Sequence, residues 1–368
     1  MSVISKIATA VPSYKYRQTH LADFMLGFLN YSEEKKNKLK VKYDKSGIDT
    51  RYSVMPDFTS SIESREFFPK TRDLEPFPTV EYRMNYFNKM ALPVCIEAIE
   101  NCLAKETKKQ DITHLITVSC TGLAAPGLDI DLVQHFKLNE TINRTSVNFM
   151  GCYAALHALK QADYICRSDE NAIVLIICVE LCTIHFQKID TLDNVTANIL
   201  FADGAAATLI VSDKYAAKNK IHGFEMKQFY SQVALDGKSD MAWRLTPTGF
   251  LMTLSSYIPQ LIEGNISPFL SKALSRLGIE KREISHWAIH PGGRKILEAI
   301  QKELVLTDTD LESSFRVLKN YGNMSSPTFL FVLKDILDNK LSNEKKEKIF
   351  GVAFGPGLTL ESVILENV

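Results

Sequence analysis

An apolar run that ends in a glycine and a cysteine is the feature that most constrains this chain. The run covers residues 145–150, Gly151 and Cys152 follow, and apolar positions then recur at helical spacing to residue 168. The pattern predicts a strand, a tight turn and a buried helix with Cys152 in its first turn. Free backbone N–H groups and the positive end of the helix dipole favour thiolate over thiol there. We therefore expect Cys152 to be the nucleophile.

Strand-like and helix-like segments alternate along the chain, and this predicts an α/β fold. After about residue 230 the pattern begins again. We therefore expect two duplicated halves, residues 1–230 with the cysteine and residues 231–368 with further reactive side chains. In the second half the spacing of apolar residues predicts one continuous helix over residues 250–277.

Composition excludes several classes of function. Among 368 residues, 43 Lys+Arg balance 43 Asp+Glu, and zero net charge argues against binding nucleic acid or anionic membranes. The longest apolar run, residues 172–179, is far shorter than the ~20 residues of a membrane span, and the first residues lack a signal-peptide pattern. Seven cysteines without a CxxC pair indicate neither a disulfide framework nor a zinc site. We expect a cytoplasmic protein without a metal, a nucleic-acid partner or stable membrane insertion.

Two further turns carry reactive residue types. His290 ends a short strand before Pro-Gly-Gly, and Asn323 follows Gly322 at the start of a helix, which repeats the pattern at Cys152. In a hydrolase, such a histidine is a base that the asparagine orients. In a thioester-condensing enzyme, both donate to an enolate oxygen while the cysteine holds an acyl group. Each residue alone also fits an ordinary packing or turn role, so the residue types leave these interpretations open.

Longer motifs make a family recognisable. They are residues 44–48 (DKSGI), 126–129 (PGLD), 201–207 (FADGAAA), 287–293 (WAIHPGG), 321–326 (YGNMSS) and 354–359 (FGPGLT). With these motifs the chain resembles the type III polyketide synthases, the chalcone synthase family, over nearly its whole length, and in particular the bacterial members.

The resemblance implies a thiolase-like fold with duplicated halves layered α-β-α-β-α, in a homodimer. It implies that Cys152 accepts a starter acyl group from acyl-CoA, while His290 and Asn323 stabilise the enolate formed when malonyl-CoA loses carbon dioxide. Repeated condensation and cyclisation would give a pyrone, a resorcinol or a related aromatic polyketide. Coenzyme A thioesters are then substrates, and no further cofactor is expected.

The resemblance also implies a substrate site. Phe201 matches a gatekeeper phenylalanine where the coenzyme A tunnel meets the cavity, and Lys38 and Lys45 match positions that contact coenzyme A phosphates. The other residues that it assigns to this site are Cys120, Thr121, Ala125, Cys182, His185, Met252, Gly292, Gly293, Gly355 and Pro356.

Several of these positions depart from the plant enzymes. Cys120, Cys182 and His185 replace threonine, Met252 replaces a phenylalanine, and Ala125 replaces a methionine that crosses the dimer interface. The two cysteines are similar to those of naphthalene-forming bacterial enzymes, which prime with malonyl-CoA. Smaller cavity residues instead suit a long acyl starter, as in alkylpyrone and alkylresorcinol synthases. Both starters stay open.

Three rival functions remain at this stage. A β-ketoacyl synthase III-like enzyme would use the same three residues once, with an extender on acyl carrier protein. An inactive scaffold would keep only the fold, and a thiol hydrolase would release the acyl group to water. The motifs at 321–326 and 354–359 favour the polyketide family over these rivals.

Overall fold

The computed structural model describes residues 1–28, 31–103, 108–341 and 345–368. Its strands are β1 (Ser2–Ala10), β2 (Tyr14–Arg17), β3 (Thr50–Ser53), β4 (His114–Ser119), β5 (Asn143–Asn148), β6 (Ile173–Leu181), β7 (Asp203–Ser212), β8 (Phe224–Val233), β9 (Met241–Thr246), β10 (Gly249–Leu254), β11 (His286–Ile289), β12 (Lys348–Gly355) and β13 (Thr359–Asn367). Its α-helices are α1 (Gln18–Phe28), α2 (Glu33–Asp44), α3 (Val80–Cys102), α4 (Leu128–Phe136), α5 (Ala154–Ser168), α6 (Leu192–Leu200), α7 (Asp213–Asn219), α8 (Ile258–Ser275), α9 (Arg294–Glu303), α10 (Glu312–Tyr321) and α11 (Ser326–Asn339).

Strand pairing repeats between the two parts of the chain. In the first half-sheet, β1, β7 and β6 pair antiparallel in that order, and β4 and β5 continue the sheet in parallel. In the second, β8, β13 and β12 pair antiparallel, and β11 continues in parallel. Pairing of β1 with β8 joins the half-sheets into one sheet, which has nine strands within the described residues. The repeat confirms the predicted duplication. β8 spans residue 230 and belongs by pairing to the second half, whereas the division after residue 230 stays a prediction.

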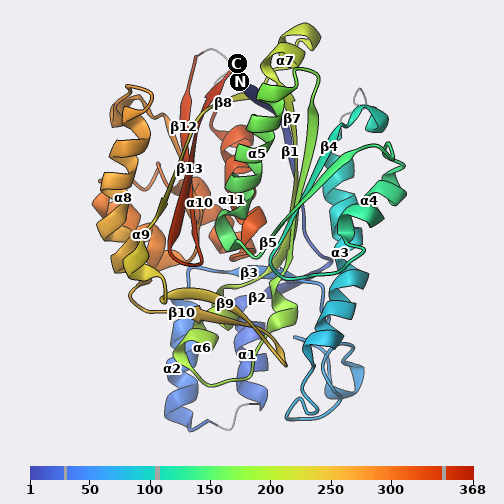
Figure 1. The fold of residues 1–368 in the computed structure, drawn as a ribbon. Helices are drawn as coiled ribbons and strands as arrows, with labels where there is room; N and C mark the ends of the chain where they lie inside the picture. The colour runs from blue at the N-terminus through green and yellow to red at the C-terminus, as the bar shows by residue number, and fades with distance from the viewer. Residues whose placement is uncertain (29–30, 104–107, 342–344) are drawn as a thin grey trace.

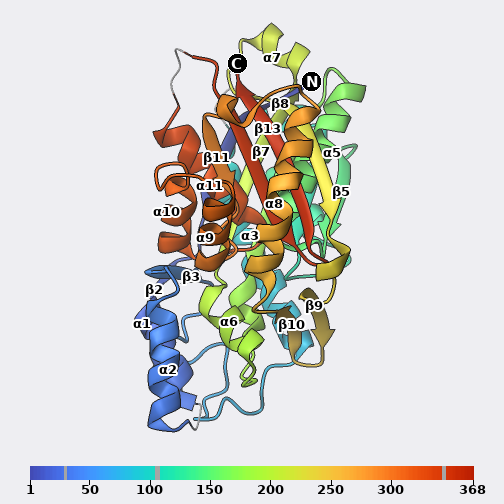
Figure 2. The same ribbon diagram turned by 90° about the vertical axis from the view of Figure 1, so that its left-hand side faces the viewer.

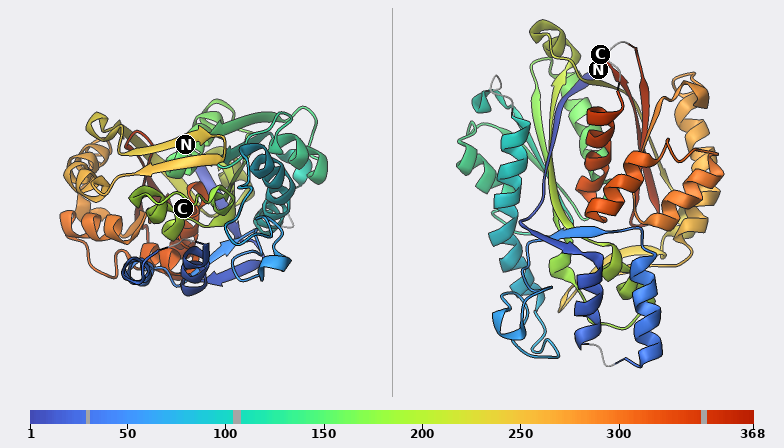
Figure 3. Two further views of the ribbon diagram at one scale, coloured as in Figure 1. Left: turned by 90° about the horizontal axis from the view of Figure 1, so that it is seen from below. Right: turned by 180° about the vertical axis from the view of Figure 1, so that it is seen from behind.

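Helices form three layers around the half-sheets. Helices α5 and α11 lie between them, α3 covers the outer face of the first, and α8 and α9 cover the outer face of the second (Figure 1; Figure 3). Each helical layer has its own cluster of buried apolar side chains. The expected α-β-α-β-α order is therefore confirmed. Strands β6 and β7 are buried along their whole length, as expected for strands covered on both faces.

Smaller elements gather at one end of the layers. Helices α1, α2 and α6 and the two-stranded sheets β2–β3 and β9–β10 lie together there (Figure 2). The predicted helix over residues 250–277 was wrong at its start, because Phe250 to Leu254 pair with β9 as strand β10 and α8 begins only at Ile258. A short apolar run carries no helical period of its own, and pairing across the turn before Gly249 decides its structure.

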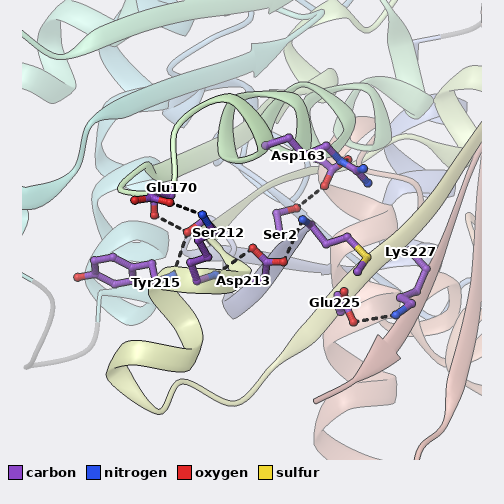
Figure 4. A network of polar contacts seen from close by, with 11 residues as sticks. Ser2, Asp163, Glu170, Ser212, Asp213, Tyr215, Glu225 and Lys227 are labelled. Atoms are coloured by element: carbon purple, nitrogen blue, oxygen red, sulfur yellow. Dashed lines mark hydrogen bonds and ion pairs between the residues drawn. The ribbon is translucent and has the colours of Figure 1, made fainter.

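At the opposite end of the molecule, polar contacts hold the N-terminus in place (Figure 4). The amino group of Met1 pairs with Asp213, and the hydroxyl of Ser2 donates to the buried carboxylate of Asp163, 2.7 Å away. Asp163 also accepts from Arg167 on the same helix, α5. These contacts fix the start of β1, the strand through which the first half-sheet pairs with the second. None of the helices in the described ranges is long and apolar enough to cross a membrane.

Candidate active site

The turn before α5 places Cys152 at the end of the molecule where the smaller elements gather. Strand β5 ends at Asn148, and Cys152 lies in a single 3₁₀ turn, Gly151–Tyr153, that leads into α5. Gly151 has φ +74°, and a Cβ there would lie 2.4 Å from Cδ of Pro356. Only glycine combines that backbone with so close a contact. Gly355 and Pro356 thus pack on the turn that holds Cys152.

The thiol of Cys152 is partly buried and has two polar neighbours. Its Sγ lies 3.7 Å from Oγ of Ser325 and 4.0 Å from Oδ1 of Asn323. Burial raises the pKa of Cys152 to about 11, although the Ser325 hydroxyl acts in the opposite direction. The thiolate expected from the helix N-terminus is therefore wrong for this state, because loss of hydration outweighs the helix terminus.

His290 follows β11 and is held by its backbone. Its N–H donates to the carbonyl of Val352 at 2.9 Å, and its carbonyl accepts from Gly292 N–H at 3.0 Å. Neither ring nitrogen has a hydrogen-bond partner among the described residues, and burial lowers the pKa of this imidazole to about 3. A buried, neutral ring with two free nitrogens is unusual for a structural histidine. It can accept a proton or donate one to a bound substrate.

Asn323 joins the other two residues. Its Oδ1 accepts from the Ser325 N–H at 2.8 Å, and its Nδ2 donates to the carbonyl of Gly292 at 3.3 Å, two residues beyond His290. Its backbone forms a bridge with Phe201. The structure thus brings the turns of Cys152, His290 and Asn323 together, although no hydrogen bond joins the His290 ring to the Cys152 thiol.

A mainly apolar cavity lies beside these turns, and four of the expected substrate residues line it: Cys182, His185, Phe201 and Met252. The cavity extends between α1, α2 and α6, and its further lining includes Leu21, Phe24, Met25, Phe58, Phe186 and Ala197.

His185 is fixed in one tautomer. Its Nε2 donates to the carbonyl of Thr121 at 2.7 Å, and its Nδ1 accepts from the Phe250 N–H at 3.1 Å. The ring stacks on Phe250 with centroids 4.3 Å apart, and Trp243 donates to the carbonyl of Cys120. Burial lowers the pKa of His185 to about 3. The His185 side chain is therefore neutral, and its hydrogen bond from Phe250 N–H holds the β9–β10 hairpin over the cavity.

Sequence reasoning missed Glu180 and Ser325. Glu180, at the end of β6, is fully buried and accepts from the hydroxyl of Thr121 at 2.7 Å and from the N–H of Cys120 at 3.0 Å. Burial raises the pKa of Glu180. Ser325 Oγ lies 3.4 Å from the Cys120 thiol and also faces Cys152. The signal for Glu180 was present, since one acidic residue interrupts the apolar run of β6.

The remaining expected residues lie around the site or at the surface. Gly292 and Gly293 form the turn between His290 and α9. Lys38 and Lys45 are exposed on and just after α2, and Lys38 pairs with Glu34. Ala125 lies in an exposed loop. In the described ranges no cluster of three His, Cys, Asp or Glu side chains could hold a metal ion.

Comparison with known proteins decides the family. Residues 1–214 match the model of the N-terminal domain of chalcone and stilbene synthases, and residues 225–368 match that of their C-terminal domain. The chain belongs to the chalcone and stilbene synthase family.

Its relatives are type III polyketide synthases along the whole chain. It is 28% identical to the alpha-pyrone synthesis polyketide synthase-like Pks18 of Mycobacterium tuberculosis, over 100% of this chain and 92% of the relative. It is 30% identical to type III polyketide synthase C of Arabidopsis thaliana, over 100% of this chain and 95% of the relative. The crystal structure of PKS-I from the brown alga Ectocarpus siliculosus superposes with a TM-score of 0.90 at 28% identity, covering 100% of this chain and 98% of that one. The type III domain of Steely1 from Dictyostelium gives 0.89, also at 28% identity, covering 100% and 99%.

Membership of the type III polyketide synthases fixes the class of reaction. Enzymes of this family are acyltransferases that condense malonyl-CoA units iteratively and use coenzyme A thioesters as substrates. The β-ketoacyl synthase III-like alternative is not favoured. The chain is a condensing enzyme of this class.

The raised pKa of Cys152 predicts how its reactivity depends on pH. Only the thiolate reacts with iodoacetamide, so alkylation of Cys152 should accelerate continuously between about pH 7 and 10, by up to about tenfold per pH unit. Ser325→Ala should slow alkylation at each pH, because the Ser325 hydroxyl lowers this pKa. The labelled peptide is followed by mass spectrometry, with Cys152→Ala as the control for other thiols. A rate that is already constant below about pH 7 would contradict the raised pKa.

Proposed function

We propose that Cys152, His290 and Asn323 form the condensing centre of this polyketide synthase. The observation that carries the proposal is the convergence of their three turns beside an apolar cavity. The Cys152 thiol lies 4.0 Å from the Asn323 side chain, and the Asn323 amide donates to the turn of His290. A partly buried thiol, an asparagine amide and an unpaired imidazole together are the set that thioester condensation requires.

Acyl loading begins at Cys152. The Cys152 proton passes to His290, whose ring nitrogens have no other partner among the described residues. The sulfur then attacks the thioester carbonyl of a starter acyl-CoA, a C–S bond forms, and the bond to coenzyme A breaks. The coenzyme A thiolate leaves with the proton held by His290. Neutral imidazole is the state that can accept this proton, and burial maintains that state.

Condensation uses the same pocket for malonyl-CoA. Its free carboxylate leaves as carbon dioxide, and the electron pair stays on the thioester as an enolate. The amide of Asn323 has two N–H donors, one of which reaches Gly292 at 3.3 Å, so the second can bind the enolate oxygen together with His290. The enolate carbon attacks the acyl carbonyl on Cys152, and the cysteine sulfur departs. The extended chain returns to Cys152 for another round.

Two variants test the proposed roles of Cys152 and Asn323 separately. Cys152→Ala should abolish product formation, because no acyl-enzyme can form. Asn323→Ala should lower release of carbon dioxide from malonyl-CoA by about 10²–10³-fold, the usual loss when one oxyanion donor is removed, while Cys152 still accepts a starter. Products are identified by mass, acyl-enzyme by intact-protein mass, and carbon dioxide by isotopic label. Product from Cys152→Ala would refute the mechanism.

We propose that the starter is a fatty acyl group. The cavity continues from Phe201 toward α1, and the side chains of Leu21, Phe24 and Met25 are apolar. Burying each methylene of an acyl chain there would contribute about 0.8 kcal/mol. The name of the mycobacterial relative describes alpha-pyrone synthesis, and we propose a pyrone product here too, formed when an enol oxygen of the chain attacks its own thioester carbonyl.

Filling the cavity should shorten the preferred starter. Ala197 on α6 lines the cavity, and Ala197→Leu should shift the preference from palmitoyl-CoA toward octanoyl-CoA, with kcat/KM for the longer starter falling by at least about tenfold. Thr196→Leu, on the same helix but outside the lining, is the matched control. An unchanged chain-length profile for Ala197→Leu, or product from malonyl-CoA alone, would refute the fatty acyl starter.

We also propose that the active form is a cytoplasmic homodimer. Strand β5 is the free edge of the first half-sheet, and only Val147 along it is buried. Arg144 on β5 pairs with Asp129, which ties this edge to α4. The adjoining loop exposes 45% of the apolar Leu123. An exposed strand edge beside apolar side chains is typical of an unpaired interface.

The oligomeric state tests this interface. The wild-type chain should elute with twice its mass of 41.5 kDa in light-scattering chromatography. Leu123→Glu places a charge in the proposed interface and should shift the mass toward one chain. Leu245→Glu, at a still more exposed leucine on β9, is the control and should leave the dimer intact. A wild-type monomer at micromolar concentration would contradict the proposal.

A further inference from the structure

Arg51 on β3 is a buried cation close to the condensing centre. Its Nε donates to Oε1 of Gln18 at 2.9 Å, and its Nη1 donates to the backbone carbonyl of Phe201. Only 4% of the residue is exposed, and it contributes to the lining of the cavity. Because arginine presents several donors in one rigid plane, it can fix two acceptors relative to each other.

No carboxylate accepts a hydrogen bond from Arg51 in the part of the chain that the structure describes. Asp203 acts on it only through longer-range charge, and burial lowers the pKa of the guanidinium to about 10. Asp203 itself is engaged by the N–H and hydroxyl of Thr183. A buried arginine whose acceptors are neutral carries a desolvation cost that a simple packing role does not explain.

The carbonyl that Arg51 binds belongs to Phe201, the residue that pairs with Asn323. Phe201 and Asn323 form an isolated parallel bridge, in which Asn323 N–H donates to Leu200 and Ala202 N–H donates to the Asn323 carbonyl, each at 2.9 Å. The backbone of Asn323 is therefore bonded on both sides to the segment that Arg51 holds.

Arg51 also lies against the residue before Asn323. Gly322 has φ +70°, and a Cβ there would meet Cγ and Cδ of Arg51 at 2.8 Å. The residues that precede Arg51 hold the end of α10, since Asp49 N–H donates to the Lys319 carbonyl at 2.7 Å. Arg51 thus contacts Gly322, the residue before Asn323, and its hydrogen bond to the Phe201 carbonyl holds the residue that pairs with Asn323.

We propose that Arg51 is a positioning residue that sets the Asn323 amide for malonyl-CoA decarboxylation. The inference rests on the proposed function, in which Asn323 donates to the enolate. The contacts of Arg51 are with Phe201 and Gly322, whereas Cys152 is placed by a separate turn packed on Pro356. Loss of Arg51 should therefore impair decarboxylation much more than loading of a starter onto Cys152.

The test compares the two half-reactions in the full-length protein. Carbon dioxide release is measured with malonyl-CoA labelled in its free carboxyl group, without a starter. Loading is measured as the rate at which lauroyl-CoA adds an acyl group to Cys152, without malonyl-CoA. Arg51→Met should lower kcat for decarboxylation by about 10–100-fold with KM for malonyl-CoA little changed, because a small displacement of a catalytic donor costs about that much.

Three other variants make the result specific. Arg51→Lys keeps the charge without the planar fork and should give an intermediate loss. Gln18→Met removes the acceptor of Nε and should reproduce part of the defect if Arg51→Met does not fold. Arg83→Met is the matched control, since Arg83 is also buried but binds the carbonyls of Pro78 and Ile184. It should leave the ratio of the two rates unchanged.

The outcomes separate this inference from the proposed function. A ratio of decarboxylation to loading that is unchanged in the Arg51 and Gln18 variants, in a wild type that carries out both half-reactions, would overturn the role of Arg51 alone. A ratio that falls equally in Arg83→Met would do the same, because any buried arginine would then have this effect. A wild type that releases no carbon dioxide from malonyl-CoA would overturn the proposed function and this inference together.

Discussion

Packing of α5 and α11 between the two half-sheets is the interaction on which the site depends. Both helices bury apolar faces in the same central cluster, and hydrophobic burial of this kind is the main favourable term in folding. One helix follows the turn of Cys152 and the other follows the turn of Asn323. Because the halves repeat the same strand order, the two turns meet at one end. His290 ends β11, the strand that corresponds to β4, and joins them there.

Burial around this centre controls its charge. The Cys152 thiol and the His290 ring are both neutral near pH 7, since burial raises the pKa of the first and lowers that of the second. A carboxyl group close to Cys152, that of Glu180, is enclosed by hydroxyl and thiol groups, and its pKa is also raised. The site therefore carries little charge before a substrate binds. In the proposed decarboxylation, negative charge develops on the bound thioester, where fixed donors are most effective.

The sequence predicted those parts that local patterns determine. The strand, glycine and cysteine at residues 145–152 indicated the nucleophile turn, and the glycine before Asn323 indicated its counterpart. The thiol pKa could not be predicted, because it depends on how deeply the tertiary fold buries Cys152. Strand β10 was assigned to a helix, since its short apolar run carries no strand period of its own and only its pairing with β9 in a tight hairpin decides its structure. Arg51 gave no local signal, because its partner Phe201 lies far along the chain.

The central claim is that an acyl group on Cys152 is extended by malonyl-CoA. The most direct test is to load the protein with lauroyl-CoA, remove free coenzyme A thioesters, and add malonyl-CoA in a single turnover. The lauroyl mass should leave Cys152 as carbon dioxide is released and an extended β-ketoacyl product appears. Release of lauric acid alone, at the same rate with and without malonyl-CoA, would contradict this claim and indicate a thiol hydrolase.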